Sequence, residues 1–302
     1  MNSPIRRLDA TAWSLLLFLS VLWGGSFLYV KVALAELPPI TIMMLRVVFG
    51  GVALLVILRL RGIAVPRDPA MWRAFAVMAV FNAILAFAFI AWGQREISAG
   101  LAAIINSATP LWTILLAHFF TSDERIDAGR AAGIALGLAG IVLLVGPDAL
   151  AGLGAAALAQ IACVVATVSY AISLVWGRRI KGVDGGTVAA GQFLTAAPPA
   201  LLLSAAIDRP WDLPMPGLAT IAAILGLVLL STAVAYIVYF RIMQDYGAGN
   251  ASLVTMLIPP SAMLLGVVFL GESVEPRAIG GFALLAAGLA IVDGRLLRAL
   301  RR

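Results

Sequence analysis

The sequence predicts an all-α integral membrane protein with ten transmembrane helices, arranged as two inverted five-helix repeats. Three observations predict this class: the composition, a series of charge-free stretches of span length, and a repeated residue pattern. Of the 302 residues, 62% are hydrophobic and 12% are charged, whereas soluble domains carry about a quarter charged residues. Together with a mean hydropathy of +1.04, this excludes an ordinary soluble globule.

Ten stretches of the chain are apolar enough to cross about 30 Å of hydrocarbon as helices. Nine of them lack Asp, Glu, Lys and Arg, and the second contains only Arg46. In chain order the stretches cover residues 11–30, 37–58, 74–94, 97–122, 131–147, 149–177, 185–207, 213–240, 246–271 and 278–292. The fifth and the tenth are short, and their apolar flanks extend them. Strands of a barrel would be about ten residues long with alternating polarity, so the sequence predicts helices.

The first stretch follows Arg6 and Arg7 but has full span length and lacks a clear cleavage site. We therefore expect a retained helix rather than a signal peptide. With ten spans, the loops place 16 Lys and Arg residues on one side of the membrane and 4 on the other. Because cytoplasmic loops carry the excess of basic residues, we expect both termini in the cytoplasm. The same bias explains the net charge of +6 without nucleic acid as a partner.

The two halves of the chain share a residue pattern. The segment 99–102 (Ala-Gly-Leu-Ala), followed by Pro110, matches the segment 248–251 (Ala-Gly-Asn-Ala), followed by Pro259, at an offset of 149. Further pairs are Ser20/Thr167, Trp23/Tyr170, Ser26/Ser173, Lys31/Arg178, Thr41/Thr187, Arg46/Gln192, Asp123/Glu272, Gly133/Gly281, Gly140/Gly288 and Gly146/Gly294. The pattern predicts two five-helix repeats, residues 11–147 and 149–294. Since five is odd, the second repeat is inverted in the membrane, an arrangement common among secondary transporters.

Several of these residues carry a resemblance to a known family. They are Leu-Trp-Gly-Gly-Ser-Phe at 22–27, Leu45-Arg46, the repeated Ala-Gly…Pro runs, the acidic residues Asp123, Glu124 and Glu272, and the Gly-rich fifth and tenth spans. In these features the chain resembles the EamA branch of the drug/metabolite transporter superfamily over essentially its whole length. More loosely, it is similar to YddG-type exporters of aromatic amino acids. The resemblance implies a central cavity with alternating access, an inner-membrane location and export of amino acids or other small metabolites.

An aromatic residue flanked by hydroxyls recurs on the first span of each repeat. Trp23, Ser26 and Phe27 lie at spacings that share one helix face, and Tyr170 and Ser173 repeat the pattern on the sixth span. In ligand pockets, rings supply contact area and hydroxyls orient polar groups. We therefore expect these five residues to line the cavity. The alternative is helix packing, in which Ser and Thr act as small residues or hydrogen bond across helices.

Four further polar residues inside the spans are candidates for substrate binding. Asn82 and Asn106 lie near mid-membrane, where an amide without partners costs several kcal/mol. They either bond across helices or face water. Tyr236 and Tyr239 follow on the eighth span, either as cavity-lining residues or as members of an interfacial aromatic belt.

Arg46 and His118 are the ionisable residues within the predicted spans. An unpaired Arg at the bilayer centre costs at least about 3 kcal/mol, so Arg46 either bonds to helix-end carbonyls or holds a substrate carboxylate. His118 lies near the cytoplasmic end of the fourth span, with either a structural role or a role in proton relay. Pro110 and Pro259 are expected to interrupt the fourth and ninth spans at equivalent places, as hinges or as ordinary kinks.

The spans contain no mid-membrane Asp or Glu, which disfavours proton coupling through a buried carboxylate and favours facilitated diffusion. One His and one Cys cannot supply a typical zinc site, and no P-loop is present. We therefore expect no enzyme activity, metal or cofactor. The expected partners are a small-molecule substrate and the lipid bilayer, with the chain as a monomer or homodimer. The alternatives are a proton-coupled, broad-specificity drug/metabolite efflux carrier and a non-carrier channel or scaffold.

Overall fold

The computed structural model describes residues 8–121, 125–146 and 154–294. Within them, ten helices are long and apolar enough to cross a membrane, which confirms the predicted all-α, ten-span class. Six spans are single helices: α1 Ala10–Ala33, α2 Pro39–Leu60, α7 Ala128–Val145, α9 Ala155–Gly177, α10 Gly185–Ile207 and α15 Pro276–Asp293. Four are divided: α3–η1–α4 (Pro69–Met78, Ala79–Leu85, Ala86–Gly93), α5–α6 (Ala99–Asn106, Thr109–Phe120), α11–η3–α12 (Leu218–Leu225, Gly226–Val234, Ala235–Tyr246) and α13–α14 (Ala248–Ala251, Val254–Leu270).

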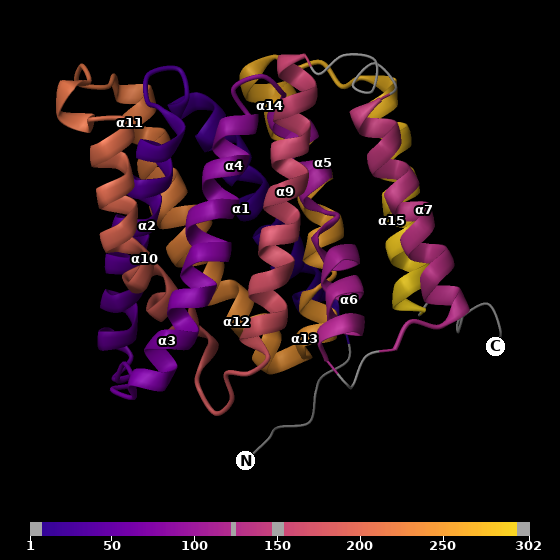
Figure 1. The fold of residues 1–302 in the computed structure, drawn as a ribbon, viewed down its shortest axis with the longest axis horizontal. Helices are drawn as coiled ribbons and strands as arrows, with labels where there is room; N and C mark the ends of the chain where they lie inside the picture. Colours follow the sequence, from indigo (N-terminus) through magenta and orange to yellow (C-terminus); the bar gives the residue numbers. More distant parts are fainter. Residues whose placement is uncertain (1–7, 122–124, 147–153, 295–302) are drawn as a thin grey trace.

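The spans stand side by side and run alternately up and down (Figure 1). We call the end of the bundle where α1 begins and α15 ends the terminal face. The opposite end, which carries the loops 34–38, 94–98, 208–217 and 271–275, is the distal face. That the terminal face is cytoplasmic stays a prediction. Arg6, Arg7, Asp123, Glu124 and the repeat boundaries at 147 and 149 lie outside the described residues.

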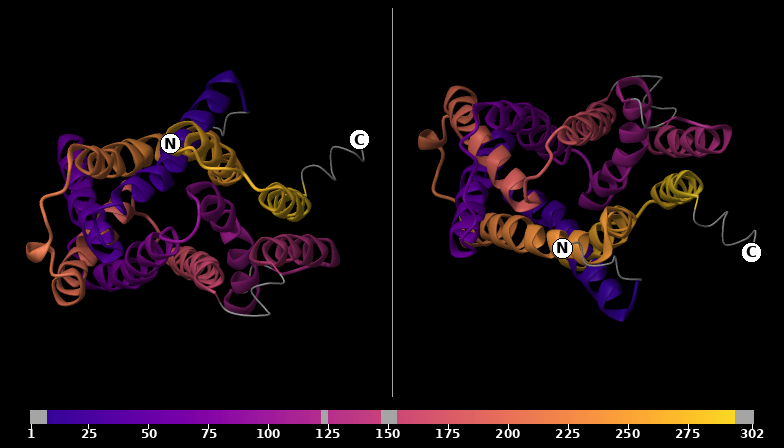
Figure 2. Two further views of the ribbon diagram at one scale, coloured as in Figure 1. Left: turned by 90° about the horizontal axis from the view of Figure 1, so that it is seen from above. Right: turned by 90° about the horizontal axis from the view of Figure 1, so that it is seen from below.

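Glycines join the two halves where α7 packs against α15, at one end of the molecule (Figure 2). A Cβ added to Gly133 would lie 2.7 Å from the carbonyl oxygen of Gly288, and one added to Gly140 would lie 2.7 Å from that of Gly281. Such small residues allow two backbones to touch. The offset of 148 exchanges these two pairs with each other, as an inverted repeat requires.

Hydroxyl bonds repeat in the same inverted way at two π-helical segments, η1 and η3. Ser231 of η3 donates to the carbonyl of Leu22 on α1 at 2.5 Å, and Ser169 of α9 donates to the carbonyl of Phe81 on η1 at 2.7 Å. Residues 22 and 169 are separated by 147 positions, and residues 81 and 231 by 150. The contact of α1 with the eighth span therefore has its counterpart in the contact of α9 with the third. Short π segments inside α-helices are frequent at functional sites, and the sequence pattern did not predict them.

The predicted equivalence of the two prolines is wrong in one respect. Pro110 lies in the first turn of α6, directly after the break between α5 and α6, where its missing N–H costs little. Pro259 instead lies inside the continuous helix α14, and the break that separates α13 from α14 comes earlier, at 252–253. Only the fourth span is therefore interrupted at its proline.

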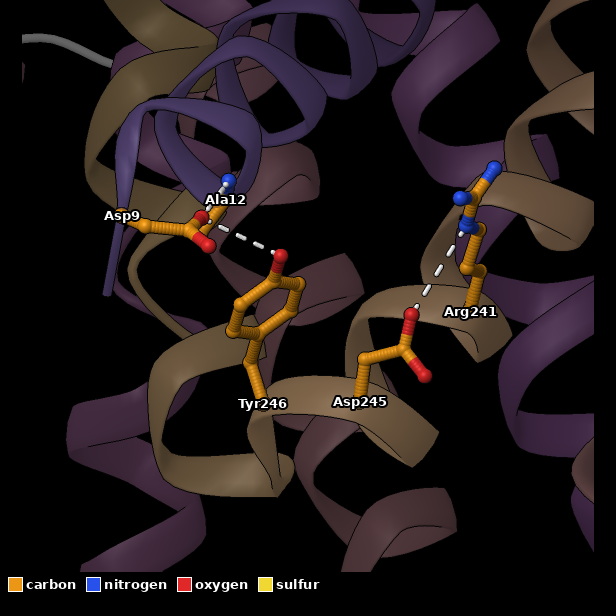
Figure 3. Close-up of polar contacts among 5 residues, drawn as sticks. All are labelled: Asp9, Ala12, Arg241, Asp245 and Tyr246. Atoms are coloured by element: carbon orange, nitrogen blue, oxygen red, sulfur yellow. Dashed lines mark hydrogen bonds and ion pairs between the residues drawn. The ribbon is translucent and has the colours of Figure 1, made fainter. Parts of the chain in front are cut away.

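Carboxylates tie α1 to the eighth span at both faces. At the terminal face, Asp9 accepts hydrogen bonds from the Ala12 amide at 2.8 Å and from the Tyr246 hydroxyl of α12 at 3.2 Å (Figure 3). At the distal face, Glu36 accepts from the Gly217 amide at 2.9 Å and from the Thr220 hydroxyl. The Ala12 amide holds the pKa of Asp9 below its usual value, and the Thr220 bond does the same for the pKa of Glu36. Both carboxylates are thus bound in their charged form.

We expect Gly288→Ala to destabilise the protein by about 1–3 kcal/mol, the usual penalty for overpacking a tight contact. The new Cβ would lie 2.5 Å from the Gly133 carbonyl oxygen and 2.6 Å from the Gly137 nitrogen. The matched control is Gly280→Ala on the same helix, because its Cβ would meet Leu143 at an ordinary 3.5 Å. Thermal unfolding in detergent measures both variants. Equal melting temperatures for the two would contradict a backbone contact between α7 and α15.

We expect Glu36→Gln to lower the melting temperature at pH 7 and to lose this effect in acid. The folded-state pKa of Glu36 lies below its unfolded value, so its contribution is fully present above that unfolded value, about 4.3. The contribution is lost as the pH falls through the folded pKa. Melting curves of wild type and variant at neutral and acidic pH measure the difference. Asp212→Asn, an exposed carboxylate on the same face, is the control and is expected to show no such convergence.

Candidate functional site

Arg46 lies inside the bundle, about 10 Å along α2 from its distal end at 1.5 Å per residue. Its guanidinium carbon is 4.0 Å from the centre of the Phe87 ring on α4, and its Nε donates to the Thr232 hydroxyl of η3 at 3.4 Å. The phenols of Tyr170 and Tyr236 lie within electrostatic range. None of these four neighbouring residues is acidic. Arg46 is therefore a cation whose charge no carboxylate of the described chain neutralises.

The helix-end alternative for Arg46 finds no support in these contacts, which lie on aromatic rings and a hydroxyl rather than on backbone carbonyls. With Cζ over the Phe87 ring and Nε bonded to Thr232, the two terminal NH₂ groups make no hydrogen bond to the described residues, and they can form a bidentate fork. Such a fork matches the geometry of a carboxylate. The side chain also keeps part of its surface accessible. Phe87 and Thr232 are thus the residues that contact the Arg46 guanidinium.

The second repeat builds the same contact without the charge. Gln192 on α10 occupies the position that matches Arg46 at an offset of 146, and Asn82 on η1 matches Thr232 at an offset of 150. The Asn82 amide donates to Gln192 Oε1 at 2.9 Å. Asn82 therefore bonds across helices, which was one of its two predicted environments. One half of the site carries a cation and the other carries a neutral amide pair.

Aromatic rings join these two halves. Four of the predicted residues, Trp23, Tyr170, Tyr236 and Tyr239, come together in this cluster and remain partly accessible. The ring centroid distances are 5.2 Å for Trp23–Tyr239, 6.3 Å for Trp23–Tyr236, 6.2 Å for Phe87–Tyr170, 5.9 Å for Phe87–Phe193 and 6.1 Å for Phe193–Tyr236. All lie within the range of favourable aromatic pairs. We call the rings together with Arg46, Thr232, Asn82 and Gln192 the central cluster.

Phe87 and Phe193 are cluster residues that the sequence analysis missed. Neither is flanked by hydroxyls in the repeated pattern, and Phe is common in every apolar span. A signal does exist for Phe193, which directly follows Gln192, the residue that matches Arg46. Its ring also fills the space left by Gly50 of α2, where an added Cβ would lie 3.1 Å away.

The other four predicted lining residues, Ser26, Phe27, Asn106 and Ser173, make no hydrogen bond to a side chain of the central cluster among the described residues. The Ser26 hydroxyl donates to the carbonyl of Trp23 on its own helix at 2.6 Å, and Phe27 is buried in the apolar core. Asn106 Oδ1 and Ser173 Oγ are buried without a protein partner among the described residues. An unsatisfied buried polar atom costs about 1–3 kcal/mol. Of the stripe predicted on α1, Trp23 makes ring contacts with Tyr236 and Tyr239 of the central cluster.

His118 forms a structural contact near the terminal face. Its Nδ1 accepts a hydrogen bond from the Ile126 amide at 3.3 Å. This bond fastens the end of α6 to the loop that leads into α7. The observation supports the structural alternative for His118 over proton relay.

Comparisons with known proteins agree with this architecture. The sequence profile of the EamA-like transporter family matches residues 11–146 and 157–292. The uncharacterized transporter YoaV of Bacillus subtilis is 22% identical over 89% of this chain and 92% of its own length. The uncharacterized inner membrane transporter YedA of Escherichia coli K12 is 26% identical over 85% of this chain and 82% of its own. The protein PA1977 of Pseudomonas aeruginosa is 30% identical over 88% and 91%.

A solved crystal structure shares the fold. It has a TM-score of 0.66 and 22% sequence identity, and the alignment covers 98% of this chain and 100% of the other. The family profile matches once in each half of the chain, and the two matches together span most of its length. The chain belongs to the EamA-like transporter family and is a multi-pass membrane transporter.

Proposed function

We propose that the protein exports small organic metabolites across the inner membrane by alternating access, and that its substrates are amino acids, aromatic ones included. The observation that carries this proposal is the uncompensated cation Arg46 on the face of Phe87. A bidentate bond to a substrate carboxylate would supply the missing negative charge. Phosphate monoesters and the inorganic sulfate ion carry more negative charge than a single Arg balances, so a carboxylate in a net-neutral molecule suits the site better than these anions.

The rest of the central cluster fits the other parts of an amino acid. The amide oxygens of Asn82 and Gln192 accept hydrogen bonds, and the faces of Trp23 and Tyr236 attract a cation. Either group can take the substrate ammonium. The same rings offer apolar area for an aromatic side chain. This supports aromatic amino acids within the class, in line with the similarity to YddG-type exporters.

The inverted contacts support a rocking mechanism. α1 is tied to the eighth span at both faces and at Leu22, while α9 is tied to the third span at Phe81. Each pair can move as a unit, because its internal hydrogen bonds need not break. Inverted repeats commonly rock in this way around a fixed site. The chain would work in the lipid bilayer as a monomer or homodimer, with the terminal face toward the cytoplasm.

We further propose that transport is uncoupled. Acidic residues of the described spans lie only near span ends, at Asp245 and Asp293, and His118 is engaged by the Ile126 amide. No described group in the cluster is therefore suited to carry a proton. A proton-coupled drug/metabolite carrier would need such a group, and a channel or scaffold would not need the unneutralised Arg46.

Reconstitution in liposomes tests the function. Uptake of radiolabelled phenylalanine and threonine is expected to saturate and to show counterflow, with no accumulation when a pH gradient is imposed. Accumulation driven by the gradient would contradict the uncoupled mechanism and favour the proton-coupled carrier. Uptake that is linear with concentration and lacks counterflow would favour a channel. Absence of uptake for both solutes would overturn the proposed substrate class.

Arg46→Gln tests the carboxylate anchor. A hydrogen bond to a charged group contributes about 1.5–3 kcal/mol, so we expect at least a tenfold rise in the KM for phenylalanine. The affinity for phenethylamine, which lacks the carboxylate, should stay unchanged when it competes for uptake. Arg59→Gln, at the exposed end of the same helix, is the matched control and should behave as wild type. Equal losses for phenylalanine and phenethylamine would assign Arg46 a structural role.

A further inference from the structure

A separate pocket opens at the distal face. It has a volume of about 510 Å³ and is enclosed by α5, α9, α14, the start of α15 and the loops 94–98 and 271–275. This volume lies within the range of small-molecule sites, about 300–1,000 Å³. Its polar lining includes Lys31, Glu96, Gln160, Glu272, Glu275 and Arg277. None of the central-cluster residues lines it, so the pocket is a second place where a solute can be held.

Gln160 is the residue of this pocket that lacks a partner. It lies on α9, is only 5% exposed, and its Oε1 has no hydrogen-bond partner among the described residues. An unsatisfied buried acceptor costs about 1–3 kcal/mol. The Gln160 side chain is part of the pocket wall while Oε1 itself is buried, so a rotation of the side chain toward the pocket would let a ligand donor supply the missing bond. A ligand N–H or O–H group would satisfy this oxygen.

Two of the charged groups that line the pocket, Glu272 and Lys31, are held by hydrogen bonds. Glu272 accepts from the amides of Ala99 at 2.8 Å and Gly100 at 3.4 Å, and an added Cβ on Gly266 would lie 2.4 Å from its Oε2. Lys31 donates to the carbonyls of Gln94 at 2.6 Å and Ile97 at 2.9 Å. These bonds hold a carboxylate and an ammonium on the pocket wall before any ligand arrives.

Arg277 supplies a second cation to the pocket wall. Its guanidinium lies against Gly146, where an added Cβ would be 2.3 Å from Nη1. Gly146 has a φ of 77° and no side chain, which leaves room for the guanidinium. The polar lining thus holds three carboxylates and two cations. Lys31 already serves two carbonyls, so Arg277 is the cation placed to meet a ligand anion.

We propose that the distal pocket binds a small zwitterion, with its ammonium at Gln160 Oε1 and its carboxylate at Arg277. The pocket wall carries more carboxylates than cations together with an unpaired acceptor, which favours an ammonium, and Arg277 favours an anionic group on the same molecule. The binding chemistry stands on these residues alone. The further statement that the pocket is a stage on the export path of an amino acid rests on the proposed function.

Equilibrium binding to the full-length protein in nanodiscs tests the pocket directly. The probes are radiolabelled glycine, threonine and phenylalanine, and the background is Arg46→Gln, which weakens the central cluster if the proposed function is right. We expect at least one probe to bind saturably and Gln160→Met to weaken that binding at least tenfold. Gln244→Met, at an exposed position of α12, is the matched control and should bind as the parent does.

Folding is checked in the same samples. Gln160→Met keeps the side-chain volume and removes the unpaired acceptor, so without ligand its melting temperature should equal or exceed that of the parent. The probe should raise the melting temperature of the parent and not that of the variant. If Gln160→Met does not fold, Arg277→Gln replaces it, with the expectation that phenylalanine then binds no better than phenethylamine.

Analogues decide the ligand class. Hydrocinnamate lacks the ammonium and phenethylamine lacks the carboxylate, so each should compete at least tenfold less well than phenylalanine in the parent. Equal competition by either analogue, no saturable binding of any probe, or unchanged binding in both pocket variants would overturn the proposal. Transport separates the two hypotheses. If binding depends on Gln160 but liposomes show no uptake, the pocket proposal holds and the proposed function is wrong. If uptake is saturable but no such binding is found, the proposed function holds and the pocket proposal is wrong.

Discussion

An unneutralised cation inside an apolar bundle constrains the architecture around it. Arg46 would be expensive in hydrocarbon, and the structure surrounds it with the face of Phe87, the Thr232 hydroxyl and two phenols. Those groups come from α4, α9 and the eighth span, so the close packing of these helices is a condition for keeping the charge there. Gly50 and Gly51 contribute by letting Phe193 approach α2. The charge at Arg46 therefore depends on the packing of these helices.

The inverted repeat organises this site as two versions of one contact. Arg46 with Thr232 and Gln192 with Asn82 occupy matching places, and the hydroxyl bonds at Leu22 and Phe81 match as well. The glycine contacts between α7 and α15 show the same exchange. The two halves thus make matching contacts, with the charge in one half only. Such matching contacts are what the proposed carrier would need in order to open alternately toward the two faces.

Much of this was accessible from the sequence, because span length and hydropathy are local properties and the repeat is a property of residue order. The matching of Arg46 with Gln192 is an example. Phe87 and Phe193 could not be singled out, since their role depends on which helix face meets which neighbour. The π segments could not be predicted from the sequence either, because a one-residue shift in hydrogen bonding leaves the hydropathy pattern unchanged. Pro259 shows the reverse error, in which a strong local signal for a break is overridden by the continuous packing of α14.

The pairing of a neutral Gln192 in one half with a charged Arg46 in the other has a consequence for the orientation in which a solute would bind. If both halves carried arginine, a carboxylate would have two equivalent anchors related by the pseudo-twofold axis, and the solute could bind in either of two opposite orientations. With the charge in one half only, there is one anchor. Each turnover would then move a single solute molecule, which keeps the same end toward Arg46 from entry to release. The protein would then carry its solute in one fixed orientation, although its own two halves are nearly equivalent.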